Sequence, residues 1–99
     1  MTIRFATQQL EDWFVGDYQG KQPFSEAVLK AYQKTIRKLD AADSLAILRQ
    51  NKSLNFHPLK RDLEGKYAVR VNMQYRIILS IDDEGEIQIL LIEQLTDYH

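Results

Sequence analysis

Apolar residues in the first half of the chain recur mainly at helical spacing. Residues 3–5 read as a short strand. An amphipathic helix over residues 7–15 is predicted by three apolar residues spaced for one helix face, Leu10, Trp13 and Phe14. Two glycines and a proline mark residues 16–23 as a loop.

Ser25 is placed to cap a second, longer helix. One face of that helix is apolar and carries Val28, Tyr32, Ile36 and Leu39. Asp43 or Ser44 can cap a third, short helix through residues 45–49. The long helix also carries a basic stripe, which is typical of a solvated helix face: Lys30, Lys34 and Lys38.

After residue 52 the apolar pattern changes to a period of two. Residues 66–71 and 75–82 alternate as half-buried strands do, and residues 83–85 suit a turn. Residues 87–92 are apolar on both faces, as in a central strand. The chain, residues 1–99, therefore reads as one α+β domain, in the order strand, two or three helices, then three strands. The helices are expected to pack on one face of a small, mainly antiparallel sheet.

The apolar pattern also fixes the register of the first hairpin. A three-residue loop over residues 72–74 pairs Val71 with Tyr75 and keeps the apolar side chains of both strands on one face. Asn72 or a neighbour is expected to supply the left-handed conformation that such loops use.

That register sets Arg70 directly opposite Arg76 on the other face. Like charges in a cross-strand pair destabilise a sheet unless acids or an anionic ligand lie between them. We therefore predict an anion site on the helix-free face. A structural cluster with Asp97 between the arginines is the alternative, and a two-residue loop would remove the pairing altogether.

Composition limits the cellular location and the bound groups that are expected for this chain. It has no cysteine, no apolar run long enough to cross a bilayer, and no apolar signal core at its start, so a cytoplasmic protein without a membrane contact is expected. The acids near residues 82–86 fit no calcium-loop spacing, and no metal or cofactor is expected. The net charge of −1 hides a basic segment over residues 49–76, which carries seven Lys/Arg against two acids.

The two histidines of the chain occur beside groups that suit metal-free RNA cleavage. His57 precedes Pro58, Leu59 and Lys60, whereas His99 ends the run Asp97-Tyr98-His99. Histidine and aspartate can move protons near neutral pH, and tyrosine can stack on a base. By itself, a histidine before proline such as His57 is usually a turn or surface residue, and a terminal histidine such as His99 is usually frayed and inert.

Several segments in order carry a family resemblance: residues 39–45, His57-Pro58-Leu59-Lys60, Val71-Asn72, Tyr75-Arg76-Ile77 and Asp97-Tyr98-His99. Together they resemble the HigB-type toxins of the RelE/ParE superfamily of bacterial toxin–antitoxin systems. The chain departs from that pattern at Arg61, where the family often has glycine, and at Met73 and Tyr75, where it often has glycine and tryptophan.

The resemblance implies a compact α+β toxin that enters the ribosomal 30S A site and cuts mRNA. It implies a co-encoded HigA-like antitoxin with a helix-turn-helix domain, and binding to operator DNA only through their complex. It implies catalytic roles for His57, Asp97 and His99. RNA contacts are implied for Lys60, Arg61, Arg70, Arg76 and Tyr98.

Two other functions fit the same fold. A ParE-like toxin would poison DNA gyrase without cutting RNA, although such toxins typically lack the terminal Asp-Tyr-His residues. An inactive relative would serve only as an antitoxin-binding regulatory module. Growth inhibition and a supercoiling assay separate these hypotheses from an RNA-cutting toxin.

Overall fold

A computed structural model of the chain describes residues 1–85 and 87–98. Along the chain the elements are β1 (Thr2–Phe5), α1 (Gln8–Val15), α2 (Glu26–Ala41), α3 (Leu45–Gln50), β2 (His57–Pro58), the 3-10 turn η1 (Arg61–Leu63), β3 (Tyr67–Arg70), β4 (Tyr75–Glu84) and β5 (Ile87–Asp97). None of the helices in the described part is long and apolar enough to cross a bilayer.

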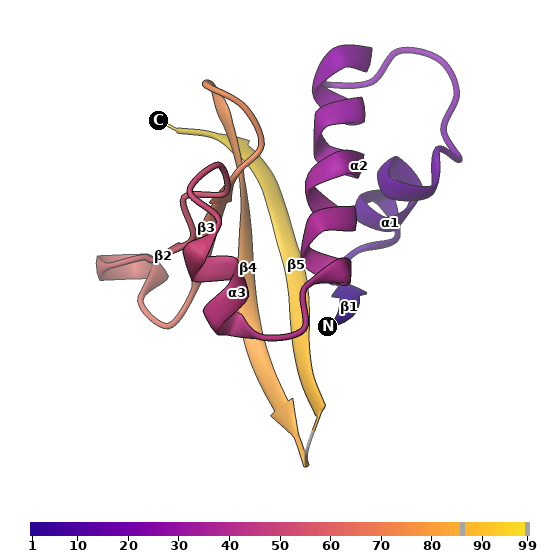
Figure 1. Cartoon of the computed structure of the whole chain (residues 1–99). Helices are drawn as coiled ribbons and strands as arrows, with labels where there is room; N and C mark the ends of the chain where they lie inside the picture. Colours follow the sequence, from indigo (N-terminus) through magenta and orange to yellow (C-terminus); the bar gives the residue numbers. More distant parts are fainter. Residues whose placement is uncertain (86, 99) are drawn as a thin grey trace.

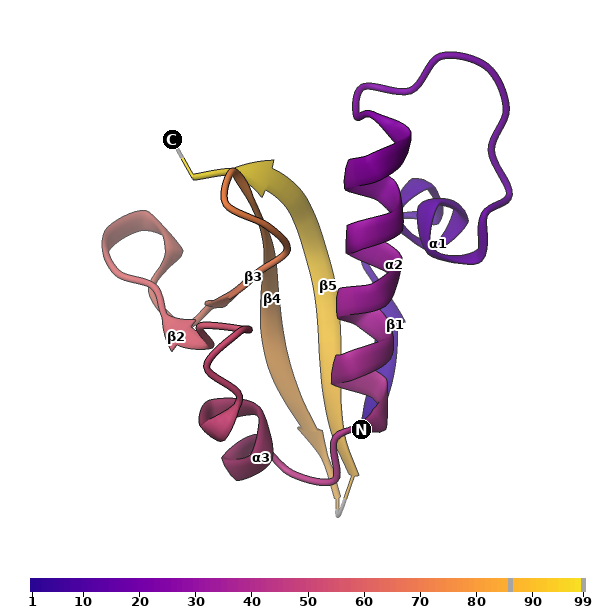
Figure 2. The same cartoon turned by 45° about the horizontal axis from the view of Figure 1, so that its top comes forward.

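The strands form one mixed sheet in the order β1-β5-β4-β3-β2. β1 lies parallel to β5, and the other neighbouring strands are antiparallel. Helices α1 and α2 lie together on one side of the sheet (Figures 1 and 2). The predicted α+β architecture and its mainly antiparallel sheet are confirmed. The prediction omitted β2, which is only two residues long.

Each helix begins at a side-chain cap. The hydroxyls of Thr7, Ser25 and Ser44 accept hydrogen bonds from the backbone amides three residues further on, at 3.2, 3.3 and 3.4 Å. A cap of this kind satisfies an amide that would otherwise lack a partner at the helix start. Of the two residues proposed to cap the third helix, the structure uses Ser44.

The core lies between α2 and the central strands. Tyr32, Ile36 and Leu39 are fully buried, as are their counterparts in the sheet, Ile77, Leu79, Leu90 and Ile92. The Tyr32 hydroxyl donates a 2.8 Å hydrogen bond to the Leu10 carbonyl, which ties α2 to α1. Burial raises the pKa of that hydroxyl, so it remains a donor throughout the physiological range.

The β3–β4 hairpin has the predicted register. Val69 pairs with Ile77, and the Val71 amide donates to the Tyr75 carbonyl at 2.9 Å. The expected left-handed residue in the loop is wrong, because no residue from 72 to 74 has a positive φ. Instead the Asn72 side-chain oxygen accepts hydrogen bonds from the amides of Gln74 and Tyr75, at 2.8 and 2.7 Å, and closes the turn.

The second hairpin turns later than predicted. Asp83 and Glu84 belong to β4 and pair with Gln88 and Ile87, so the expected turn over residues 83–85 is wrong for its first two positions. Gly85 leaves the strand with a φ of +65°, a conformation that costs glycine little.

Candidate functional site

Arg70 and Arg76 form the centre of the candidate site. They are Cα partners across the β3–β4 pair, as predicted. Their neighbours Val69 and Ile77 are fully buried in the core, so strand alternation places both arginines on the opposite, helix-free face. Two guanidinium groups are thereby held side by side on one surface.

Tyr98 touches both arginines. Arg70 Nε donates to the Tyr98 hydroxyl at 3.4 Å, and the Arg76 guanidinium carbon lies 5.6 Å from the centre of the Tyr98 ring. A cation over an aromatic face is attracted to the electron-rich ring. The Tyr98 amide also donates to the Gln74 carbonyl at 3.0 Å, which ties the chain end to the hairpin loop.

One atom of this cluster is buried without compensation. Arg76 Nε has no hydrogen-bond partner among the described residues, although it is shielded from solvent. A buried donor left unsatisfied costs about 1–3 kcal/mol. An anion between the two arginines would supply an acceptor and offset their mutual repulsion.

His57 belongs to the same face. It is the Cα partner of Ala68 in the β2–β3 pair, and Ala68 lies two residues before Arg70 on β3. Residues in this diagonal relation lie about 7–8 Å apart in regular sheets, with their Cβ atoms somewhat closer. The structure therefore brings His57 beside the arginine pair, although 13 residues separate it from Arg70 in the sequence.

Asp97 lies on the other face of the sheet. Asp97 is the Cα partner of Tyr75, whose ring packs edge-on against Phe24 on the helix side of the sheet, 5.4 Å between centroids. Alternation therefore places Asp97 on the face opposite the arginines. His99 lies outside the described residues.

Lys60 and Arg61 are exposed on a loop beyond the sheet edge. The Leu59 amide donates to the Lys66 carbonyl at 2.9 Å and closes this loop at the start of β3. Arg70 lies four residues further along β3, about 13 Å away at the usual rise of a strand. The structure therefore does not bring Lys60 and Arg61 into the arginine cluster. They lie at the outer rim of the face that carries it.

Comparison with known proteins identifies the family. The model of the HigB-like toxins, RelE-like toxins of type II toxin–antitoxin systems, matches residues 3–99. The chain belongs to this family. No curated protein matches it.

Solved structures of other toxins share the fold of this HigB-like family member. A YoeB/ParE toxin from Agrobacterium tumefaciens superposes with a TM-score of 0.61 at 15% identity, covering 100% of both chains. YafQ from E. coli gives 0.60 at 18% identity over 97% of this chain and 91% of that one. In a YoeB–YefM complex from Staphylococcus aureus the match is 0.55 at 21%, over 100% and 97%.

The sequence interpretation missed one ion pair on the face of this HigB-like chain that carries the arginines. The Lys66 ammonium bonds the Glu93 carboxylate. Burial raises the pKa of Glu93, but hydrogen bonds from Lys66 and Ser80 and the charge of Lys66 lower it by more, and the net pKa is lowered. Glu93 is the extra residue of a β-bulge, since Leu79 pairs with Ile92 and Ile78 with Gln94. The signal in the sequence is a change of phase, because Glu93 and Gln94 both lie between the core residues Ile92 and Leu95.

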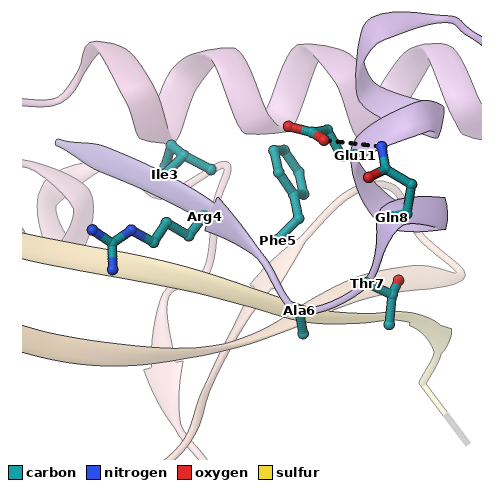
Figure 3. A pocket seen from close by; sticks show the side chains of 7 residues that line it. All are labelled: Ile3, Arg4, Phe5, Ala6, Thr7, Gln8 and Glu11. Atoms are coloured by element: carbon teal, nitrogen blue, oxygen red, sulfur yellow. Dashed lines mark hydrogen bonds between the residues drawn. The ribbon is translucent and has the colours of Figure 1, made fainter.

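The arginine pair is not part of the pocket beside β1. A pocket of about 310 Å³ lies beside β1 and the start of α1. Gln8 donates a 3.0 Å hydrogen bond to Glu11 at its edge, and Figure 3 shows the side chains that line it. None of the predicted site residues lines it. A pair of cations on one face of a sheet, outside an enclosed pocket, suits an extended polyanion better than a small enclosed ligand. Within the described ranges, no cluster of three or more His, Cys, Asp or Glu is arranged to hold a metal ion.

Proposed function

We propose that this HigB-like toxin is a ribosome-dependent mRNA endonuclease that cuts without a metal ion. The observation that carries the proposal is the pair of arginines opposite each other on the helix-free face, with Tyr98 on both and His57 diagonal to Arg70. Positive charge, an aromatic ring and a proton-transfer group meet there, as cleavage of a single RNA strand requires.

In the proposed reaction the ribose 2′-oxygen attacks the adjacent phosphorus. A base takes the 2′-hydroxyl proton, the bond from phosphorus to the 5′-oxygen breaks, and an acid gives that leaving oxygen a proton. The products are a 2′,3′-cyclic phosphate and a 5′-hydroxyl. Arg70 and Arg76 stabilise the charge that grows on the phosphate oxygens, because a guanidinium can bond two of them at once.

The faces of the sheet support the choice of base, whereas the choice of acid rests on the family resemblance. We propose His57 as the base, because it shares a face with the arginines, and His99 as the acid, on the strength of the family resemblance alone. Asp97 is the alternative base, and its opposite placement on β5 makes it the weaker one. Tyr98 would stack on a base with the ring face that Arg76 leaves open, and Lys60 and Arg61 would bind the flanking RNA backbone.

The proposed partners are an antitoxin and the 30S A site with its mRNA. Among similar folds, a YoeB toxin occurs in complex with YefM, which supports an antitoxin partner for this chain. We propose a HigA-like helix-turn-helix antitoxin, through which alone the pair would bind operator DNA.

The decisive experiment is to map mRNA ends in a purified translation system with untagged protein, with and without ribosomes. Codon-register cuts on translated message alone are expected, ending in cyclic phosphate. Cuts on naked RNA as well would indicate a ribonuclease that needs no ribosome. An uncut message would overturn the proposal, whether or not translation is inhibited. A supercoiling assay would then test gyrase poisoning.

A further inference from the structure

Two strained backbone positions bracket the segment that carries His57. Asn55 and Arg61, with φ of 47° and 61°, are the non-glycine residues with positive φ in the part of the chain that the structure describes. Such conformations cost about 1–2 kcal/mol for most residues and persist only where the surroundings impose them. The first position carries Asn, which tolerates the left-handed region better than most side chains.

The conformation of Asn55 aims its carbonyl at the His57 ring. His57 Nδ1 lies 2.6 Å from the Asn55 carbonyl oxygen. A carbonyl oxygen only accepts, so Nδ1 must carry the proton in this contact. In the neutral ring, Nε2 is then left with its lone pair available to take a proton.

The chain on both sides of Asn55 is fixed. The Leu54 carbonyl accepts the Arg70 amide at 2.6 Å, and the Asn55 amide donates to the Lys52 carbonyl at 3.2 Å. The Phe56 ring stacks on Tyr67, with 5.2 Å between centroids. The carbonyl of Asn55 therefore cannot turn away from His57 without breaking neighbouring contacts. One of these is the hydrogen bond that joins Leu54 to Arg70 of β3.

We propose that Asn55 is a positioning residue that sets the tautomer of His57 through its left-handed backbone, so that Nε2 is the proton acceptor on the arginine face. This inference rests on the proposed function for its catalytic consequence, but the tautomer itself does not depend on cleavage. Asn55 acts through its main-chain carbonyl, so the conformation that a substitution permits matters more than its side-chain chemistry.

The test is ¹⁵N NMR of the imidazole nitrogens at alkaline pH, with the His57 signals assigned by comparison with His99→Gln. Wild type and Asn55→Gly should show the Nδ1-protonated ring, because glycine adopts positive φ freely. In Asn55→Val the branched side chain disfavours that φ, and the ring should shift toward the Nε2-protonated form, which the free side chain prefers. Asn55→Ala gives a milder version should the valine variant fold poorly.

Asn51→Val is the matched control in the same loop. Asn51 has an ordinary φ of −81°, and its side chain bonds Ser53, so this change perturbs the loop without touching the His57 contact. It should leave the tautomer unchanged, whereas Asn55→Val should also lower the single-turnover cleavage rate roughly tenfold or more.

The outcomes separate this inference from the proposed function. An Nε2-protonated ring in the wild type, or a tautomer that Asn55→Val and Asn55→Ala leave unchanged, would overturn the positioning role. The predicted tautomers in a protein that cuts no message would uphold the structural role of Asn55 and overturn the nuclease instead.

Discussion

The two faces of the sheet are built from alternate residues of the same strands, yet they do different work. On the helix side, Ile77 and Val69 are fully buried against α2. One position away along each strand, Arg76 and Arg70 lie on the helix-free side, and both contact Tyr98. One face holds the fold together by excluding water, and the other carries charge that the fold alone does not compensate.

The two faces therefore separate residues that stabilise the fold from residues of the proposed active site, even where they are neighbours in the sequence. Arg76 and Ile77 are adjacent, but their side chains serve different faces. Substitution of a buried helix-side residue such as Ile77 should destabilise the protein, whereas substitution of either arginine should remove the proposed activity and leave the fold in place.

The largest expected effect is on the helix side. Ile77→Ala should lower the free energy of unfolding by about 2–5 kcal/mol, since it leaves a cavity in a fully buried position. Urea denaturation followed by circular dichroism measures this. Ile87→Ala is the control, because Ile87 is 56% exposed and its loss should change stability little. Equal losses from the two variants would contradict the division between faces.

Arg76→Ala should have a comparable effect on catalysis. Removing one donor that stabilises transition-state charge typically lowers a rate about 10²–10³-fold. The melting temperature should stay within a few degrees, because Arg76 contributes chiefly a ring contact and an unsatisfied Nε. Message cleavage and thermal unfolding are measured on the same samples. Arg4→Ala, on the far strand, is the control: an unchanged rate is expected there, and a matching loss would mean that total charge alone matters.

Glu93→Gln should make the free energy of unfolding less dependent on pH. The pKa of Glu93 is lowered in the folded protein, so its pair with Lys66 stabilises at neutral pH and is lost as the pH falls through that lowered pKa. We expect the wild type to be more stable by about 1 kcal/mol at neutral pH and the two to converge in acid. Urea unfolding at several pH values tests this, with Glu84→Gln, from an exposed pair, as the weaker control.

Arg61→Gly should have the smallest effects, and they should be opposite in kind: a gain in stability and a loss of RNA affinity. Glycine relieves the positive φ of 61°, and after its own entropic cost a gain of about 0.5 kcal/mol in stability is expected. RNA affinity should fall, because one rim cation is lost. Lys60→Gly, at an ordinary φ of −125°, should instead lose both stability and affinity. A stabilising change at Lys60 would refute the strain argument.

The sequence by itself determined which residues face each other. Periods of two and of three to four assigned the helices, the strands and the core face, because side-chain direction follows local backbone geometry. That was enough to place Arg70 opposite Arg76. Ser25 was likewise identified as a cap, since capping depends on a few neighbouring residues.

Tertiary structure decided what lies beside those elements. The parallel pairing of β1 with β5, the bulge at Glu93 and the short edge strand that brings His57 next to Ala68 all depend on contacts between distant segments. The left-handed Asn55 and the contacts of Tyr98 are imposed in the same way. Local periodicity does not determine them, because their energies come from hydrogen bonds and packing that exist only once the strands have paired.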